Sequence, residues 1–529
     1  MKKITAFFIF FLGMFSISPG QHWDWTRLIG KRSFFTQADP SGNCFIGGKI
    51  TDTIRIDNYY VQRSPDSLVF LAKIDTRGHC SWLKKIKATA INSFNIDAND
   101  NLFITVDTLP EMQYNDERTS NSLIKYDSLG TELWTRQLVV TPDNQYHHFC
   151  FIYYIEPMDN GKVLLKGDFV GNLRLGSLTL SDSTWHTFFA ECSSSGNFVW
   201  LKMESWNLSG VHNTCIYRDK IFCLEQDTLV ALDTAGNWLN AINVISRPNS
   251  PSYSYGWCEY FLDNDSAGNL YVAQTFERTV QIGTYAFTDV AYPPSCQYCS
   301  WQGDIYLFKM RPTGSILWAE RFFSRYSDFL SGMSVSAQGN IVLSGTNGDI
   351  FYVNSDTLDL RENSLFLLLF DANGNTKMLT GIYNIMGGVY YGSSLTLSDK
   401  SIFISGITTN DGIYVLGNDT ISKGACFLSK ITPDMIAGLS ITDVPGESLV
   451  LSPVPGRDLV TLHYSSATTI GAYSIYILNE QGQLMYREDS YEASNSLIKG
   501  MNVRPFPKGI YFLELVTGER KAVQKIVTE

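Results

Sequence analysis

The chain has 529 residues, of which 44% are hydrophobic, and it carries a formal net charge of −11. This length is enough for two or more domains, each with an apolar core. An acidic chain without a cluster of Lys and Arg is poorly suited to nucleic acid or to an anionic membrane surface, because both partners need concentrated positive charge.

Residues 1–20 are typical of a secretory signal peptide. Met1, Lys2 and Lys3 form a basic start, an apolar run covers 4–15, and small residues follow, so we place the cleavage site after Gly20. The apolar run is too short for a helix that spans a bilayer, and no later stretch is apolar for long enough. The sequence therefore predicts export without a membrane-spanning segment.

Two short phrases alternate along residues 21–435. The first is an apolar strand followed by Asp-x-x-Gly-x-x-x-Trp, which is complete at 75–82 and 127–134 and partial at 196–200, 233–236, 314–318 and 371–374. We expect the recurring Trp to fill the space between neighbouring sheets. The strands of this phrase are expected at 69–74, 123–126, 188–190, 229–232, 305–310, 365–370 and 425–431.

The second phrase is a turn rich in Gly, Asn and Asp that leads into a β-rich strand. Its seven copies begin on the order of 60 residues apart, at Pro40, Asn99, Asp159, Arg218, Ser266, Ala337 and Ser398. Such residues suit tight hairpin turns, and the β-branched and aromatic residues that follow suit a half-buried sheet. Each unit thus supplies about four short strands, which predicts an all-β, seven-bladed β-propeller.

The two ends of this region complement each other. The seventh unit reaches Thr432 and Pro433 without a Trp strand of its own, whereas residues 22–27, which contain Trp23 and Trp25, resemble residues 133–136. We therefore expect the N-terminal strand to complete the last blade, which would remove two exposed sheet edges.

Residues 167–176, followed by 188–190 and 196–200, resemble the SBBP-type β-propeller repeats of secreted bacterial proteins. The resemblance extends over roughly residues 22 to 435 and rests on the repetition of loose motifs. It implies a fold and no particular activity.

The tail has motifs of its own after a linker at 436–446. Residues 451–463, 473–484 and 506–515, with a last strand at 521–527, resemble the type A sorting domain of the type IX secretion system, although Val454 stands where an Asn is usual. The alternation of apolar residues in these segments predicts a small β-sandwich over 447–529. The resemblance implies interaction with the secretion machinery, passage through the outer membrane, and attachment to the cell surface or release. It also implies a Bacteroidota-like source.

The even number of cysteines favours disulfides in an exported chain, although their connectivity stays open. Cys215 and Cys223 are placed to join neighbouring strands, and Cys258 to reach a loop with two further cysteines. A zinc site at that loop would be half filled, because one Cys-x-x-Cys supplies only two of four ligands. The ten cysteines are Cys44, Cys80, Cys150, Cys192, Cys215, Cys223, Cys258, Cys296, Cys299 and Cys426.

Few patterns in the sequence indicate catalysis, a cofactor or a metal. It has no His-x-x-x-His, no Gly-x-Ser-x-Gly and no phosphate-binding Gly loop. Residues 263–268 resemble a calcium loop but lack its later ligands and coincide with a repeat turn. The spacing of a sialidase Asp-box is not met, and the quinoprotein dehydrogenases, which have a similar Trp-ended phrase, commonly need a Cys-Cys pair that is missing here. We predict no cofactor, no metal and no identifiable catalytic residue.

The fifth unit contains more aromatic residues than a blade requires. Residues 250–260 contain Tyr253, Tyr255 and Trp257, and the insertion at 292–304 contains Tyr298 and Trp301. Such residues on loops suit stacking on sugar rings or binding a protein partner. The alternative is a disulfide-linked loop that only covers one end of the ring.

Two functions remain open on this sequence. The first is a secreted or cell-surface propeller that binds glycan or protein through these five aromatic residues and has no catalytic activity. The second is a secreted enzyme that acts on polysaccharide, with carboxylates from different blades meeting in the central funnel.

Overall fold

The structure is a computed structural model in which every regular element is a β-strand within the ranges it describes. Those ranges are 21–30, 34–65, 68–108, 120–141, 149–158, 161–204, 214–225, 227–248, 260–289, 303–324, 328–347, 350–353, 356–359, 364–384, 392–397, 401–407, 414–416, 419–421, 426–433, 448–452, 459–465, 469–479, 484–492, 494–517 and 520–528. The chain divides into two compact units, 1–433 and 434–529. The predicted signal peptide and the predicted linker lie outside the described residues, as do the five predicted binding residues. No helix in the described ranges is long and apolar enough to cross a membrane.

The first unit is built from antiparallel paths of four strands. Neighbours within each path are hydrogen-bonded and follow one another in the sequence. The first three paths are β2 (Phe34–Ala38), β3 (Cys44–Lys49), β6 (Val69–Ile74) and β7 (Cys80–Ile86); β8 (Ala90–Ile96), β9 (Leu102–Asp107), β10 (Ser120–Tyr126) and β11 (Glu132–Thr141); and β12 (Phe149–Pro157), β13 (Val163–Leu175), β14 (Leu178–Cys192) and β15 (Phe198–Met203).

The same pattern continues along the chain. The next paths are β16 (Thr214–Tyr217), β17 (Lys220–Glu225), β18 (Thr228–Asp233) and β19 (Trp238–Asn243); β21 (Phe261–Asn264), β22 (Leu270–Phe276), β25 (Asp304–Met310) and β26 (Ile316–Phe323); and β27 (Phe329–Val335), β28 (Ile341–Asn347), β31 (Ser364–Phe370) and β32 (Thr376–Asn384). Each predicted strand of the Trp phrase up to residue 370 is therefore confirmed.

The last path joins the two ends of the unit. It consists of β33 (Gly392–Leu397), β34 (Ile402–Ile407), β37 (Cys426–Pro433) and β1 (Gln21–Leu28). Strand β1 runs antiparallel to β37 and pairs Gln21 with Pro433 and Leu28 with Phe427. The N-terminal strand thus occupies the outer position that a Trp strand holds in the other paths.

Short strands are inserted between the second and third strands of several paths. They are β4 (Thr53–Ile56) with β5 (Tyr59–Gln62), β23 (Thr279–Ile282) with β24 (Tyr285–Thr288), β29 (Ile350–Val353) with β30 (Asp356–Asp359), and β35 (Tyr414–Leu416) with β36 (Asp419–Ile421). A two-residue strand, β20 (Ile245–Ser246), pairs with β23. Because β26 pairs with β29 and β32 with β35, these insertions also connect successive paths.

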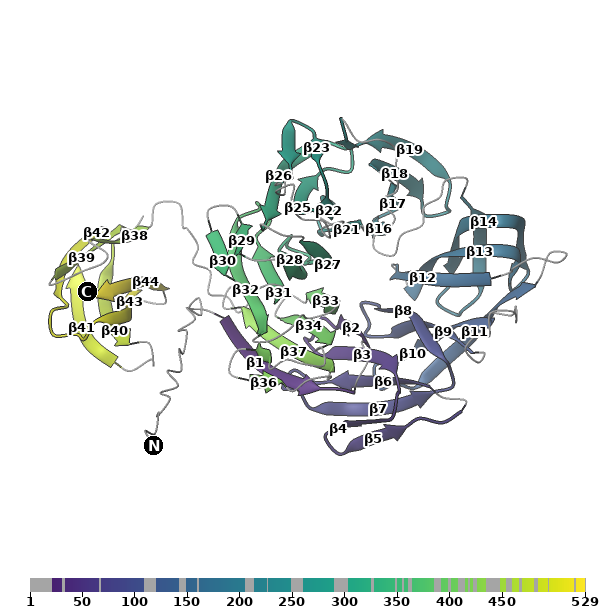
Figure 1. Ribbon diagram of the computed structural model, residues 1–529, viewed down its shortest axis with the longest axis horizontal. Helices are drawn as coiled ribbons and strands as arrows, with labels where there is room; N and C mark the ends of the chain where they lie inside the picture. The colour runs from purple at the N-terminus through teal and green to yellow at the C-terminus, as the bar shows by residue number, and fades with distance from the viewer. Residues whose placement is uncertain are drawn as a thin grey trace, which may run out of the picture. The chain divides into compact units, whose positions relative to one another are not determined.

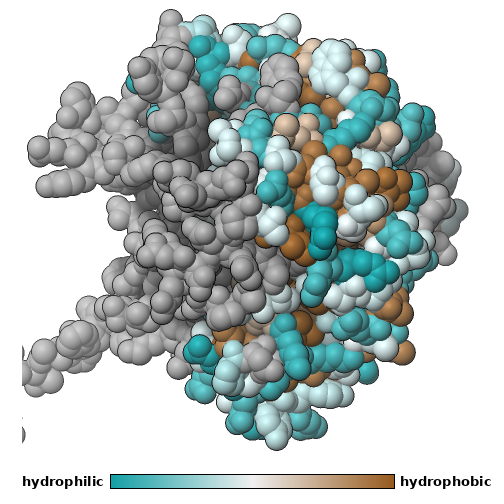
Figure 2. Space-filling view, turned by 90° about the vertical axis from the view of Figure 1, so that its right-hand side faces the viewer, coloured by the Kyte–Doolittle hydropathy of each residue, from teal (hydrophilic) through white to brown (hydrophobic). Residues whose placement is uncertain are grey.

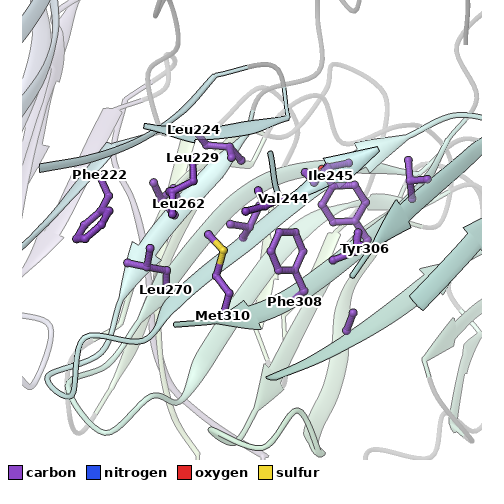
Figure 3. Packing of buried hydrophobic residues seen from close by; sticks show 14 of the residues in the cluster. Phe222, Leu224, Leu229, Val244, Ile245, Leu262, Leu270, Tyr306, Phe308 and Met310 are labelled. Atoms are coloured by element: carbon purple, nitrogen blue, oxygen red, sulfur yellow. The ribbon is translucent and has the colours of Figure 1, made fainter. Parts of the chain in front are cut away.

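Figure 1 shows the paths following one another around a common centre, with β2, β8, β12, β16, β21, β27 and β33 nearest to it. Apolar cores fill the space between successive sheets. In one of them, Phe222 and Leu229 of the β16–β19 sheet pack with Leu270, Tyr306 and Phe308 of the next sheet (Figure 3). Burial of these large side chains at each junction gives the arrangement most of its stability.

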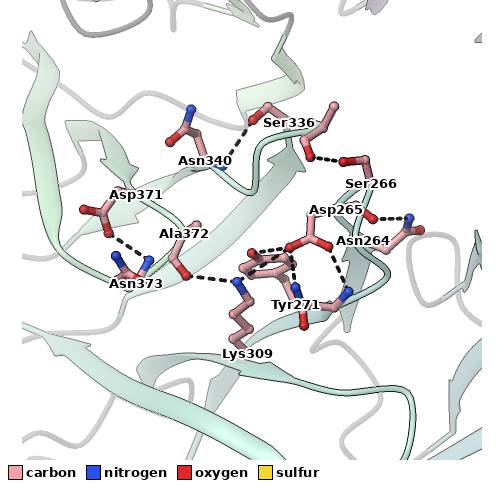
Figure 4. A network of polar contacts seen from close by, with 12 residues as sticks. Asn264, Asp265, Ser266, Tyr271, Lys309, Ser336, Asn340, Asp371, Ala372 and Asn373 are labelled. Carbon is pink, nitrogen blue, oxygen red and sulfur yellow. Dashed lines mark hydrogen bonds and ion pairs between the residues drawn. The ribbon is translucent and has the colours of Figure 1, made fainter. Parts of the chain in front are cut away.

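Hydrogen bonds also join successive sheets at their turns. In Figure 4, the ammonium group of Lys309 donates to the carbonyl of Ala372 at 3.1 Å, and the hydroxyl of Ser266 donates to the carbonyl of Ala337 at 2.7 Å. The carboxylate of Asp265 accepts from the backbone and side chain of Asn269 and from the hydroxyl of Tyr271. This Asp belongs to the segment that resembles a calcium loop, and its carboxylate oxygens accept hydrogen bonds that stabilise the turn.

The second unit is a β-sandwich. Strands β38 (Ser448–Ser452), β39 (Leu459–Ser465) and β42 (Ser496–Asn502) form one sheet, and β41 (Leu484–Glu492), β40 (Gly471–Asn479), β43 (Gly509–Thr517) and β44 (Arg520–Thr528) form the other. Leu462 and Met501 from the first sheet share a core with Ile475 and Leu513 from the second. The predicted tail strands are therefore present and pack face to face.

Candidate functional site

The described residues bring together the bases of the two loops that contain the predicted aromatic residues. Arg247 and Tyr260 flank the first loop, and the carboxylate of Asp227 accepts from both: the Arg247 Nε lies 3.0 Å from each carboxylate oxygen, and the Tyr260 hydroxyl lies at 3.2 Å. The guanidinium of Arg247 also donates to the amide oxygen of Gln274 at 2.9 Å, and Tyr306 donates to the same oxygen at 2.6 Å. One partly buried network therefore fixes both ends of this loop.

The second loop is also held at both ends. Before it, Asp289 N donates to the carbonyl of Arg278 at 2.8 Å, and after it Asp328 N donates to the carbonyl of Gly303 at 3.1 Å. A Cβ on Gly303 would lie 2.6 Å from the side chain of Thr275, so the backbone needs glycine to come this close. Tyr253, Tyr255, Trp257, Tyr298 and Trp301 themselves lie outside the described residues, and their role as binding residues stays a prediction.

Polar side chains on the innermost strands form a second group, near the turns at the other end of these strands. The Gln37 amide donates to Asn95 at 3.0 Å, and the Asn95 amide donates to the carboxylate of Glu156 at 3.0 Å. The hydroxyl of Tyr154 also donates to Glu156, at 3.3 Å. Side chains from three paths thus form one hydrogen-bonded chain that ends at the carboxyl group of Glu156.

Two carboxyl groups in this region have raised pKa values. Burial, together with the nearby charge of Asp263, raises the pKa of Glu156 to about 8. Burial also raises the pKa of Asp263 to about 6, although its carboxylate accepts from the backbone of Asn264 and Val335. Glu156 lines a cavity of about 200 Å³ together with Ile96, Asp97, Pro157 and Met158. A carboxylic acid that keeps its proton near neutral pH is a candidate for proton transfer.

The sequence analysis did not single out Glu156, and it considered Asp263 only as the first residue of the segment that resembles a calcium loop. The only signal was a polar residue near the end of an innermost strand, and this signal is shared with Gln37 and Asn95. Their convergence depends on the way the sheets are placed around the centre, which a single strand does not encode.

The predicted disulfide between Cys215 and Cys223 is wrong, because both are free buried thiols. Cys215 on β16 stands opposite Phe222, and Cys223 on β17 stands opposite Thr214. The two side chains belong to apolar cores on opposite faces of the sheet. Cys258, Cys296 and Cys299 lie outside the described residues; the remaining described cysteines, Cys44, Cys80, Cys150, Cys192 and Cys426, are also free.

The described ranges contain no group of three or more His, Cys, Asp or Glu residues that could hold a metal ion. The predicted absence of a metal and of a cofactor stays a prediction.

Comparison with known families decides the role of the tail. Residues 451–529 match the family described as the secretion system C-terminal sorting domain. The tail is a secretion sorting domain. It directs export through the type IX secretion system to the cell surface or into the medium, which confirms the predicted destination. No curated protein matches the chain.

Several solved structures share a distant likeness to the chain. A protein of unknown function from Bacteroides caccae is 9% identical, with 63% of this chain and 93% of that chain covered and a TM-score of 0.31. The Pan2 WD40 domain of Neurospora crassa is 10% identical, with coverage of 65% and 89% and a TM-score of 0.34. The Dos1 propeller is 7% identical, with coverage of 78% and 94% and a TM-score of 0.31. Likeness at this level assigns no function to the first unit.

Proposed function

We propose that this protein is an exported, cell-surface or secreted seven-bladed β-propeller of the SBBP repeat type that binds a glycan or a protein and has no catalytic activity. The binding residues would be Tyr253, Tyr255, Trp257, Tyr298 and Trp301. The observation that carries the proposal is the network around Asp227 and Arg247, which holds the base of the first aromatic loop. Fixed loop bases reduce the conformational entropy that is lost when the loop binds a partner.

The proposed ring is supported by contacts of the last path with the first and sixth paths, and by a contact within the last path itself. The backbone of Ala38 on β2 donates to Thr396 on β33 at 3.3 Å, and that of Leu397 donates to Ser334 on β27 at 3.2 Å. The hydroxyl groups of Thr26 on β1 and Ser429 on β37 lie 2.9 Å apart. Such contacts are expected if seven four-stranded blades surround one axis and β1 completes the last blade.

Glycan-array screening and pull-down with residues 21–435 test the binding function. We expect a bound glycan or protein whose capture falls about tenfold or more in a Trp257→Ala variant, because aromatic anchors dominate the binding energy of such sites. Trp238→Ala is the matched control, since Trp238 is 57% exposed and pairs with Leu232, at the end of the β18–β19 pair that lies farther from Asp227. Turnover of a polysaccharide without any stable binding would refute the proposal.

Glu156 and Asp263 favour a second candidate, a polysaccharide-acting enzyme with its site in the centre of the ring. Their raised pKa values differ, as the pKa values of an acid and a base in a glycosidase do. The separating experiment is the release of reducing ends from a panel of polysaccharides by the purified protein. Activity that Glu156→Gln abolishes, with folding unchanged, would establish this candidate; no release from any polysaccharide would refute it.

A further inference from the structure

Three aromatic side chains gather on the β12–β15 path, and none of them belongs to the proposed binding site. The ring centroids of Phe149 on β12 and Trp185 on β14 lie 4.2 Å apart, and Phe151 is two residues further along β12. Trp185 is 55% exposed and Phe151 is 43% exposed. We call Phe149, Phe151 and Trp185 the Trp185 platform. In Figure 2, the side of the molecule where β13 and β14 lie shows apolar and polar residues interleaved.

A bulge in the strand pairing accounts for the exposure of Trp185. Phe169 pairs with His186 and Gly171 pairs with Asp182, so residues 183–185 stand opposite Val170 alone. Extra residues on one strand redirect side chains, and such bulges occur often beside functional sites. Phe149 pairs with the same Val170, which explains why its ring meets that of Trp185.

Hydrogen bonds to a buried carboxylate hold the platform in place. The buried carboxylate of Asp168 accepts from Tyr153 at 3.1 Å and from Thr187 at 2.8 Å. The side chain of Trp185 also donates to it. Phe151 pairs with Asp168 across the sheet, and its ring lies 6.1 Å from that of Tyr153. An exposed indole fixed in this way loses little rotamer freedom when a ligand stacks on it.

Polar groups continue from the platform toward the next sheet. The ammonium group of Lys166, two residues before Asp168 on β13, donates to Thr214 on β16 at 3.1 Å. The carboxylate of Glu225 on β17 is close enough to interact with the charge of Lys166. Lys166 and Thr214 are themselves buried, and the polar groups accessible beside Trp185 are those of its own bulge. There the hydroxyl of Thr184 donates to the carboxylate of Asp182 at 2.7 Å and lies 3.1 Å from Nε2 of His186.

We infer that the Trp185 platform is a binding site for a neutral oligosaccharide. The C–H face of a pyranose ring would stack on Trp185 and Phe151, and its hydroxyl groups would meet the polar residues beside them. The accessible carboxylate of Asp182 beside Trp185 and the formal charge of −11 disfavour an acidic sugar. This inference deepens the proposed binding function by naming a glycan, and it uses none of the five aromatic residues of the proposed loop site.

Isothermal titration of the mature chain with cellohexaose, mannohexaose, xylohexaose and chitohexaose tests the inference, with oligogalacturonate as the acidic probe. At least one neutral probe is expected to bind. Trp185→Ala should then raise Kd about tenfold or more, since the loss of one stacked ring is worth on the order of a factor of ten. Trp185→Phe should have a smaller effect. Trp238→Ala, which removes an equally exposed indole, should leave Kd unchanged.

Each outcome separates the inference from the proposed function. No binding of a neutral probe, or binding that Trp185→Ala leaves unchanged, would overturn the platform as a glycan site. If Trp257→Ala abolishes binding and Trp185→Ala does not, the loop site stands and the platform does not. If Trp185→Ala instead weakens capture of a protein, the platform binds protein and the inference is refuted. The unfolding midpoint of each variant is measured first, and Trp185→Phe replaces Trp185→Ala if the alanine variant is not folded.

Discussion

The recurring Trp connects successive sheets by a hydrogen bond as well as by packing. Its indole N–H donates to a carbonyl in a turn of the next sheet, at distances of 3.0 to 3.2 Å. Where the indole packs against the turn, both the backbone angle and the contact require glycine. Gly78, for example, has a φ of 84°, and a Cβ there would lie 2.8 Å from the ring of Trp25. The pairs that share this contact are Trp25 with Thr76, Trp82 with Ser128, Trp134 with Ser194, Trp200 with Thr234, and Trp318 with Ala372.

A pair of substitutions separates the two contributions of this Trp. Trp134→Phe should lower the free energy of unfolding by about 1 kcal/mol, because it removes the hydrogen bond to Ser194 and keeps most of the packing. Trp134→Ala should cost about 2 kcal/mol or more, because it also removes the edge-to-face contact with Phe103. Urea unfolding measures both. Trp238 lacks this contact among the described residues, so an equal loss in Trp238→Ala would contradict the explanation.

The raised pKa of Glu156 predicts how stability depends on pH. The folded state holds the proton up to about pH 8, whereas the unfolded state releases it near the ordinary value of 4.5. The stabilising contribution of this proton is therefore present below pH 4.5 and is lost as pH rises through about 8. Glu156→Gln, which resembles the protonated form, should be more stable than the natural chain at pH 8, and this gain should shrink toward pH 4.

Chemical unfolding at several pH values measures this difference. Glu132→Gln is the matched control for the substitution itself, because Glu132 is exposed on β11. A difference between Glu156→Gln and the natural chain that stays constant between pH 4 and pH 8 would contradict the assignment.

At the scale of elements, the pairing of β1 with β37 predicts tolerance to circular permutation. A chain that begins at residue 34 and carries residues 21–30 after Pro433 through a short Gly-Asn linker keeps β1 beside β37. It should fold with a stability close to that of the first unit in its natural order, because it preserves the ladder and places the new ends in a loop.

Deletion of residues 21–30 provides the contrast, since it leaves β37 as an uncovered edge. This variant should lose several kcal/mol of stability or aggregate, because an unpaired strand edge invites association. Size-exclusion chromatography and thermal unfolding compare the circularly permuted chain with the deletion variant. A stable, monomeric deletion variant would contradict the role given to β1.

At the scale of the whole molecule, the sorting domain predicts where the chain goes. Without residues 447–529, the first unit should remain in the periplasm of a host that has the type IX secretion system, because the secretion machinery recognises the tail. Fusion of 447–529 to an exported fluorescent protein should carry that protein to the surface or the medium. Surface protease accessibility measures both, and normal display of the truncated chain would contradict the prediction.

Because the described cysteines are free thiols, we expect that a reductant does not change the stability of the described part of the molecule. Thiol titration of the denatured protein should count at least seven groups. A count below seven would show that some of the buried cysteines pair. Burial raises the pKa of the Cys80 thiol to about 12, so this group should react only after denaturation.

The sequence predicted local strand structure better than the meeting of distant residues. The repeat identified β6 and β25 because turn residues and apolar runs recur at regular intervals, and motifs identified the tail for the same reason. It could not predict the group around Glu156 or the Trp185 platform, because both depend on contacts between strands. The sequence analysis made no prediction for Trp185, and only the bulge in the strand pairing explains why its side chain is exposed.

The strand that begins the described chain has a consequence for the order in which the protein matures. The hydroxyl of Thr432 donates to the carboxylate of Asp24 although the two residues are 408 positions apart. Strand β1 is synthesised before its partner strand β37, and it therefore stays unpaired until nearly the whole first unit has been made. A chain interrupted anywhere before β37 leaves β1 unpaired, so the pairing of β1 with β37 requires that the first unit has been synthesised as far as β37.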